Sequence, residues 1–270
     1  MVRYVDYRDL QSGDDVIRLY DSQAFAAVAH VSKLAAQCLD EVAALIAPGV
    51  TTKQIDDFVL QFAHEHQLIP ATLNYHGYRH ACCTSVNHVI CHGIPNHKCL
   101  RENDIINVDV TFILDGWHGD TSRMYPVGAI KRAASRLLEV THECLMRAIA
   151  VVRPGVKTGA IGQVIQQYAE SQNCSVVRDF CGHGLGRSFH ENPQILHYGK
   201  EDEGIELREG MIFTIEPMIN LGKPEAKILA DGWTAVTRDR SLSAQYEHTL
   251  GVTDKGCKVF TLSPKEIFYL

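Results

Sequence analysis

Five residues of this 270-residue chain are candidate ligands of divalent metals, four of them acidic and one a histidine. In chain order they are Asp109, Asp120, His183, Glu216 and Glu247. Carboxylates suit hard and borderline metals, and imidazole suits iron, manganese, cobalt or zinc. Taken together, four carboxylates and one imidazole can hold two divalent ions. Such ions can lower the pKa of water from 15.7 to about 7, which gives a nucleophile at neutral pH.

The two aspartates are predicted to lie on one face of a β-hairpin, in the segment NVDVTFILDGWHGDTS. Its apolar residues alternate with polar ones, and Asp115-Gly116 is a strong signal for a two-residue turn. That turn would pair Asp109 with Ser122, so Asp120 would share a face with Asp109. Diagonal neighbours on one face are roughly 7–8 Å apart. Two carboxylates that converge inside a sheet need a cation between them or a raised pKa.

The other three ligand candidates differ in how strongly their surroundings indicate a site. His183 lies in CGHGLGRSFHENP, whose glycines let backbone approach a metal, although a histidine in a glycine-rich turn is the commoner case. Glu216 lies inside the apolar run MIFTIEPMI, where an unpaired buried carboxylate is costly. Glu247 is at strand spacing in SAQYEHTLGV, where a surface glutamate is the alternative.

Two further histidines are candidates for catalysis. His92 lies in VICHGIPN, and His190 lies in SFHENP, shortly after His183. An imidazole beside a metal centre can donate to a developing oxyanion or bind the scissile amide. The alternative is that both are ordinary loop histidines, because the chain has 14 histidines and composition alone gives no support.

The composition indicates a globular protein and argues against several kinds of partner. Hydrophobic residues make up 46% of the chain, which is ordinary. A net charge of −6 without a basic stripe argues against nucleic acid or an anionic membrane. No apolar run approaches the ~20 residues of a membrane span. The acidic N-terminus has no signal-peptide core, so we expect a cytoplasmic protein whose nine cysteines are reduced.

A helix-turn-helix pattern occurs twice along the chain. Helices are predicted at residues 23–46 and 130–152, the first capped by Asp21 or Ser22. Each is followed by a Pro-Gly-Val turn, a capping threonine and a second helix. This repetition suggests two related halves, although ordinary turn chemistry shared by two such units would also explain it.

Strand-like runs predict an α+β fold with an antiparallel sheet. They recur at 105–113, 117–127, 176–181, 211–219, 233–238 and 245–253. We expect an N-terminal arm at residues 1–21 and one domain at 22–270, with pseudo-repeat halves at about 22–128 and 129–262.

From about residue 22 to residue 262 the chain resembles the type I methionine aminopeptidases. The resemblance is carried by CHGIPN, NVDVT, GDTSRMYPVG, CGHGLGRSFHENP, FTIEPMI and SLSAQYEHT, in that order. It implies the pita-bread fold, a curved antiparallel sheet backed by helices with an internal pseudo-twofold. It also implies removal of the initiator methionine from new polypeptides by dinuclear-metal hydrolysis, with a preference for a small second residue.

The resemblance further implies a role for each candidate residue. Of two divalent ions (cobalt, manganese, iron, zinc or nickel), Asp109 would chelate one, Asp120 and Glu247 would bridge both, and His183 and Glu216 would complete the second. Glu216 would also shuttle the proton of the attacking water. His92 would contact the scissile amide nitrogen or nearby peptide, and His190 the substrate carbonyl.

The resemblance also maps a methionine pocket and a monovalent-cation loop onto the chain. The pocket would comprise Tyr75, Tyr78, Cys83, Phe189 and Trp233, with Thr72 where many members carry cysteine. An apolar slot closed by aromatic rings suits a thioether, although these rings could also be core residues. The cation loop would fall near Asn87, Val89 and Ser243, and His88 stands where an acidic residue is usual.

The expected partner is the N-terminal methionine of nascent polypeptides, and a contact with the ribosome is a further candidate. No nucleic acid substrate or membrane is expected, and nothing requires more than a monomer. One alternative is a proline-specific pita-bread aminopeptidase, a class that usually has a sizeable additional N-terminal domain. Another is a non-catalytic pita-bread binding protein, which loss of ligands would mark. The interval between Glu216 and Glu247 leaves no room for the helical insertion of type II enzymes, so a bacterial-type cytosolic enzyme is the main expectation.

Overall fold

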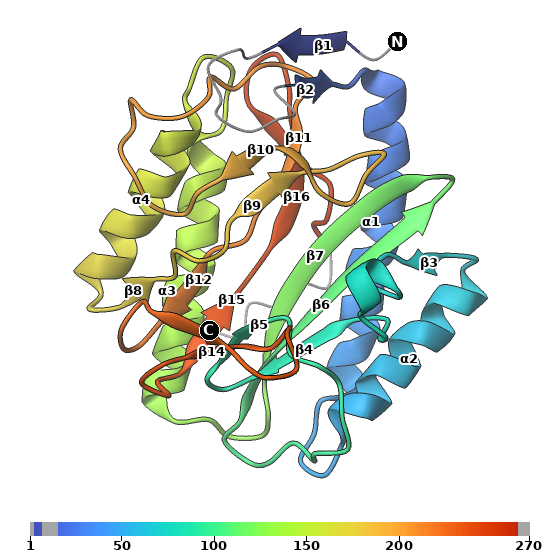
Figure 1. Ribbon diagram of the computed structural model, residues 1–270, viewed down its shortest axis with the longest axis vertical. Coiled ribbons are helices and arrows are strands. Elements are labelled where there is room, and N and C mark those ends of the chain that lie inside the picture. Colours follow the sequence, from blue (N-terminus) through green and yellow to red (C-terminus); the bar gives the residue numbers. More distant parts are fainter. Residues whose placement is uncertain (1–2, 7–15, 264–270) are drawn as a thin grey trace.

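The computed structural model describes residues 3–6 and 16–263, and it shows antiparallel sheets backed by helices (Figure 1). One helix pair lies on each side of the view, and the strands lie between them. This arrangement is the expected α+β architecture. The α-helices are α1 (Ser22–Val42), α2 (Thr52–Glu65), α3 (Arg132–Val151) and α4 (Thr158–Ser171).

Local side-chain chemistry starts the first two helices as predicted. The Asp21 carboxylate accepts hydrogen bonds from the amides of Gln23 and Ala24 and caps α1. Thr51 caps α2 in a reciprocal capping box with Gln54. The first α-helix is shorter than predicted, because a 3-10 turn, η1 (Ala43–Leu45), takes over its last residues.

The predicted threonine cap of the fourth helix is wrong. Lys157 occupies the N-cap position of α4 and makes no side-chain capping bond. The hydroxyl of Thr158 instead accepts a hydrogen bond from the amide of Ile205 at 3.1 Å. The side-chain oxygen of Thr158 is therefore used in a long-range hydrogen bond and does not cap the helix.

The two Pro-Gly-Val turns make matching hydrogen bonds. The amide of Gly49 donates to Leu100 O, and that of Gly155 donates to Leu207 O, both at 2.9 Å. Each leucine amide donates back at 2.7 Å to the valine that follows its glycine. Both glycines have a positive φ, which any other residue would adopt at a cost. The boundaries of the two halves stay a prediction.

The first hairpin matches its prediction residue by residue. Strands β6 (Ile105–Leu114) and β7 (Trp117–Pro126) pair in one unbroken register that includes Asp109 opposite Ser122. Asp115 and Gly116 both have positive φ, as a type I′ turn requires. Strands β3 (Ile69–Pro70) and β4 (Cys83–Val86) flank β6 in the same sheet.

The predicted strands 211–219 and 245–253 are both interrupted. The expected strand 211–219 is β11 (Ile212–Ile215) followed by β12 (Met218–Asn220). The expected strand 245–253 is β16 (His248–Val252), which follows β15 (Ser243–Gln245) after a gap. β11 pairs with β16 in a five-stranded sheet, whereas β12 pairs with β15 in a three-stranded sheet.

Shorter strands complete the described structure. They are β1 (Arg3–Asp6), β2 (Val16–Leu19), β5 (Val89–Cys91), β8 (Ser175–Val176), β9 (Gly182–Gly184), β10 (Glu191–Ile195), β13 (Ala226–Ile228), β14 (Ala235–Thr237) and β17 (Cys257–Val259). Of the predicted strand 176–181 only the first residue is in a strand, β8, and the predicted strand 233–238 is shortened to β14.

Two large apolar clusters hold the helices on the sheets. One joins α1 and α2 to β6 through residues such as Val31, Val59 and Phe112. The other joins α3 and α4 to β11 through residues such as Leu138 and Phe213. All nine cysteines are free, and no helix among the described residues is long and apolar enough to cross a membrane. The sheet surface between the clusters carries the polar residues described next.

Candidate metal site and peptide cavity

The first hairpin places two carboxylates in a low-dielectric setting. Period-two alternation puts Asp109 and Asp120 on the same face of β6 and β7. The hydroxyl of Thr111 donates to Oδ1 of Asp120 at 2.6 Å. Burial raises the pKa of Asp120 to about 7. Burial, reinforced by the charge of Asp120, raises the pKa of Asp109 well above its usual range.

The two interrupted, paired strand segments place two more carboxylates opposite each other. The register is the same on both sides of the interruption, so Glu216 faces Glu247 across it. Glu216 accepts hydrogen bonds from Thr214 Oγ1 at 2.8 Å and from Gln245 Nε2 at 3.2 Å. Burial and the neighbouring carboxylates raise the pKa of both glutamates well above its usual range.

Hydrogen bonds between the first hairpin and the segment around Glu247 bring the two carboxylate pairs together. The amide of Glu247 donates to Ser122 O at 3.1 Å, next to the strand position of Asp120. The hydroxyl of Thr121 donates to Glu247 O, and that of Thr249 donates to Asp120 O. These bonds join β7 to the segment that carries Glu247.

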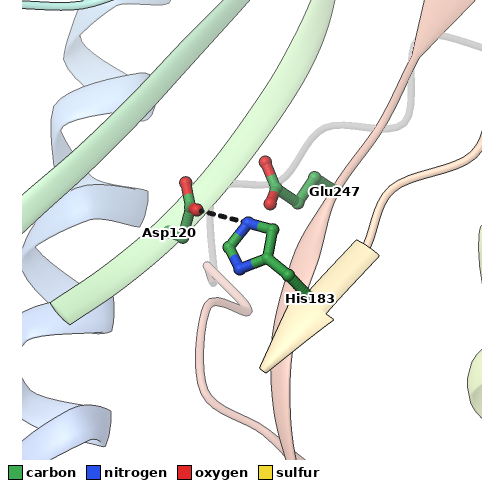
Figure 2. A group of neighbouring side chains, drawn as sticks. All are labelled: Asp120, His183 and Glu247. Atoms are coloured by element: carbon green, nitrogen blue, oxygen red, sulfur yellow. Dashed lines mark ion pairs between the residues drawn. The ribbon is translucent and has the colours of Figure 1, made fainter. Parts of the chain in front are cut away.

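His183, on β9, completes the cluster. Its Nε2 lies 3.5 Å from Asp120 Oδ2 and 3.6 Å from Glu216 Oε1. Its Nδ1 lies 3.1 Å from Gly184 O, which can only accept, so Nδ1 carries the proton and Nε2 presents a lone pair. Burial lowers the pKa of His183 to about 3, which keeps the ring neutral. Figure 2 shows Asp120, His183 and Glu247 pointing toward one another, with one ligand atom from each within 4.8 Å of the others.

This donor set fits divalent metal ions. Four crowded carboxylates repel one another when ionised, and only a cation among them would relieve the repulsion. A neutral imidazole and several carboxylate oxygens are the donors that transition metals accept. The cationic residue in the cavity lining is Arg18, which is ion-paired to Glu191.

A cavity of about 1010 Å³ surrounds the cluster and contains the other predicted site residues. Its lining includes all five ligand candidates, both candidate catalytic histidines, the five pocket residues and Thr72. His190 lies against Phe189 and bonds through Nδ1 to Tyr75 Oη at 2.7 Å. His92 makes edge-on contacts with Phe180 and Trp233.

The predicted methionine pocket is formed by aromatic rings that are fixed by hydrogen bonds and ring contacts. Tyr78 is buried, and its hydroxyl donates to Cys82 O and Gly93 O at 3.0 and 3.1 Å. Its ring meets Trp233 edge-on at 5.1 Å. Tyr75 packs against Phe189 at 4.9 Å. The pocket is therefore apolar, and its walls are held in place.

The predicted cation loop is also assembled, although cation binding stays a prediction. The amide of Ser243 donates to Asn87 O at 2.9 Å, and Val89 lies on the neighbouring strand β5. Asn87 has a φ of 56° and accepts from Ile105 through Oδ1. His88 contributes its carbonyl to the amide of Thr237.

Several residues that support or line the site were not predicted from the sequence. Thr111 and Thr214 lie two positions from predicted ligands, and this same-face spacing could have revealed them. Arg18 and Val16 line the cavity from β2, in a part of the chain without a recognisable motif. Glu191, next to His190, links that strand to the site.

Comparison with known proteins places the chain in a family. The model of the family described as "Metallopeptidase family M24" matches residues 26–254. The chain belongs to metallopeptidase family M24. It is 52% identical to methionine aminopeptidase of Rickettsia prowazekii (strain Madrid E) over 94% of this chain and 98% of that protein. It is 48% identical to methionine aminopeptidase of Escherichia coli (strain K12), over 85% and 88% of the two chains.

Solved structures of this family confirm the pita-bread fold. The crystal structure of the Rickettsia prowazekii enzyme matches with a TM-score of 0.90, covering 91% of this chain and 100% of that chain. Prolidase from Pyrococcus furiosus shares the fold with a TM-score of 0.73 at 17% identity, and the match covers only 65% of it. The resemblance to methionine aminopeptidases is thus confirmed, whereas the likeness to prolidases is one of fold.

Proposed function

We propose that the chain is a methionine aminopeptidase that removes the N-terminal methionine of new polypeptides by metal-dependent hydrolysis. The observation that carries the proposal is one continuous cavity that joins the carboxylate–histidine cluster to an aromatic pocket. A peptide whose first side chain fills the pocket would have its first peptide bond beside the cluster. The identities with named methionine aminopeptidases support the same activity.

Two divalent ions would be held by Asp109, Asp120, His183, Glu216 and Glu247. When bound, such ions lower the pKa of water and polarise a substrate carbonyl. Cobalt, manganese, iron, zinc and nickel all suit this donor set. A monovalent cation near Asn87, Val89 and Ser243 would stabilise the adjoining loops.

Glu216 would be the proton shuttle of the reaction. Thr214 and Gln245 each bond one of its carboxylate oxygens and fix its orientation. Burial raises its pKa, so its carboxylate would be a stronger base that takes a proton from the attacking water and then passes it to the leaving amine. General acid–base catalysis of this kind depends on a positioned group with a raised pKa.

The two histidines would orient the peptide. A proton donated by Tyr75 to Nδ1 of His190 leaves Nε2 as the N–H that points to a substrate carbonyl. Burial lowers the pKa of His190 to about 4, which keeps this ring neutral. His92, held between Phe180 and Trp233, would contact the amide nitrogen of the scissile bond.

The pocket would select methionine and leave little room for the next side chain. Tyr75, Tyr78, Phe189 and Trp233 form its aromatic walls, and Cys83 belongs to its lining. An unbranched thioether makes favourable contacts with such rings. The second side chain would lie beside the two histidines, and a small residue there is therefore preferred. We place the enzyme in the cytosol as a monomer that meets nascent chains, with the ribosome as a candidate contact.

The test is hydrolysis of Met-X-Ser peptides by protein reconstituted with each candidate metal. We expect release of methionine when X is Ala, Gly or Ser, and little when X is Leu or Phe. Ala-Pro-Ser peptides serve as the comparison for a proline-specific enzyme. Cleavage of the proline peptides, or of no Met-X peptide with any metal, would overturn the proposal.

A further inference from the structure

The cavity continues beyond the metal cluster and the methionine pocket. Val16 and Arg18 line it from β2, and Ser188, Glu191 and Gln194 line it from β10 and the preceding loop. In Figure 1, β2 lies beside β10 near the top of the view. A volume of about 1010 Å³ is at the upper end of what a drug-sized ligand fills, so one methionine side chain occupies only part of it.

Arg18 is held at this end of the cavity by a largely buried carboxylate, that of Glu191. Its Nη1 lies 2.5 Å from Glu191 Oε1 and 3.5 Å from Ser188 Oγ. Glu191 also accepts from Tyr20 Oη at 2.9 Å and from the Ser188 amide at 2.8 Å. Its side chain is 9% exposed, whereas that of Arg18 is 36% exposed. Glu191 is therefore an anchor, and Arg18 is the group presented to the cavity.

The guanidinium has donors to spare. Arginine carries five N–H donors in a planar fork; the bonds to Ser188 and Glu191 use Nη1, and Tyr20 is a further neighbour. Donors at Nη2 and Nε remain for acceptors that enter the cavity. Charge-assisted hydrogen bonds of this kind are stronger than those between neutral groups.

The position of Arg18 relative to His190 indicates which part of a bound peptide would contact it. Glu191 directly follows His190, the proposed contact of the substrate carbonyl, and His190 in turn contacts Tyr75 and Phe189 of the methionine pocket. The peptide beyond the scissile bond must leave the cavity away from the methionine pocket. Arg18 is anchored on Glu191 and lines the same cavity, so a peptide that extends past His190 would meet it.

We propose that Arg18 forms a subsite for oxygen acceptors of the substrate beyond its second residue. The inference rests on the proposed aminopeptidase function and extends it to the third and fourth residues. The acceptors are main-chain carbonyls or carboxylates, which share the chemistry that a guanidinium recognises. The N-terminal strand thereby becomes part of the substrate-binding surface.

The experiment compares kcat/KM for Met-Ala-amide with that for Met-Ala-Ser-Gln-amide and Met-Ala-Ser-Glu-amide. In the wild type the longer peptides should be better substrates. In Arg18→Ala the ratio of tetrapeptide to dipeptide should fall roughly tenfold, the effect of losing one hydrogen bond to a charged group. Arg18→Lys should give an intermediate ratio, because it keeps the charge and loses the fork.

The two tetrapeptides distinguish the sources of the acceptor. An equal fall for both identifies main-chain carbonyls, and a larger fall for the Glu peptide identifies a carboxylate. Arg147→Ala is the matched control, because Arg147 makes an arginine–glutamate pair with Glu143 outside the cavity. Its ratio should equal that of the wild type.

An unchanged ratio in Arg18→Ala would overturn the subsite. If thermal melting shows that this variant is unfolded, Arg18→Gln, which keeps most of the side chain, takes its place, and an unchanged ratio in that variant overturns the subsite equally. Failure of every protein to hydrolyse Met-Ala-amide would instead refute the aminopeptidase function itself. The two failures are therefore distinguishable.

Discussion

The two carboxylate pairs of the candidate metal site come from two different kinds of backbone. Asp109 and Asp120 lie within an unbroken hairpin, on diagonal positions of one face. Glu216 and Glu247 lie at a matched interruption, where two paired strands leave one sheet and enter another. Strand alternation sets the direction of the two aspartate side chains, whereas hydrogen bonds around the interruption set the direction of the two glutamates.

This difference shows where the precision of the site originates. A regular strand fixes side-chain direction with a period of two, so the aspartates need little further support. Outside a strand no such rule holds. Glu216 depends on hydrogen bonds from Thr214 and Gln245, and Glu247 on the bond that its amide donates to Ser122 O. The regular hairpin is therefore the rigid part of the site, and hydrogen bonds to it hold the segment that carries Glu247.

The largest expected effect tests whether a metal joins the two pairs. Exhaustive chelation should reduce Met-Ala-Ser hydrolysis to background, a loss of at least about 10,000-fold, because the carboxylates cannot activate water alone. Titration with a divalent ion should restore the activity, which is measured as the release of methionine. Full activity in protein shown by elemental analysis to be metal-free would break the comparison, because the pairs would then share no ion.

The second prediction separates the roles of the two pairs. Glu216→Gln keeps the size of the side chain but cannot carry the proton, so kcat at saturating metal should fall by about 100- to 1,000-fold. The melting temperature should stay close to that of the wild type. Glu225→Gln, an exposed glutamate, is the control and should be fully active. Near-normal turnover by the Glu216 variant would remove that residue from catalysis.

The hairpin could be predicted from the sequence because its determinants are local. Alternating apolar residues set the strands, and the Asp115-Gly116 turn sets the register, so Asp109 was correctly placed opposite Ser122. The same reasoning failed for Glu216 and Glu247. Both lie in apolar, strand-like runs, and the interruption depends on a change of sheet that only the tertiary fold determines.

Long-range contacts also explain the other differences. The Thr158 hydroxyl bonds to the amide of Ile205 instead of capping its helix, although its sequence context resembles that of Thr51. Arg18 reaches the cavity through Glu191, which is distant in sequence. No pattern within the segment around Arg18 indicates such a role. The motif residues were found by resemblance, and the residues that hold them in place needed the structure.

The third prediction compares two threonines, one bonded to an aspartate of the regular hairpin and one bonded to a glutamate at the interruption. Thr111→Val removes the bond to Asp120, and Thr214→Val removes the bond to Glu216. Loss of such a supporting bond typically lowers metal affinity 10- to 100-fold. Isothermal titration with manganese should show the larger loss for Thr214→Val, because no regular strand aims Glu216. The control is Thr84→Val, whose hydroxyl is buried without a hydrogen-bond partner among the described residues. Equal affinities in all three variants would contradict this account.

The fourth and smallest prediction concerns the stability of the metal-free protein. The pKa of Asp120 is raised from 3.8 to about 7 in the folded state, so the folded protein holds a proton that the unfolded chain releases above about pH 4. The resulting stability is present below that pH and is lost as the pH rises through 7. The change corresponds to roughly 4 kcal/mol at most. Buried histidines act in the opposite sense, because burial lowers the pKa of His183, His197 and His248 to about 3 and that of His190 to about 4.

A variant isolates the carboxylate contribution from that of the histidines. Asp109→Asn with Asp120→Asn keeps all of these histidines, so their contribution cancels in the difference from the wild type. Without metal, urea unfolding should show the double variant to be more stable at about pH 8, with the gap closing toward pH 4. Manganese should reverse the order at pH 8, since only the wild type keeps the aspartate ligands. A difference that does not depend on pH would mean that the hairpin holds its two carboxylates without mutual repulsion, and the regular pair would then need no cation.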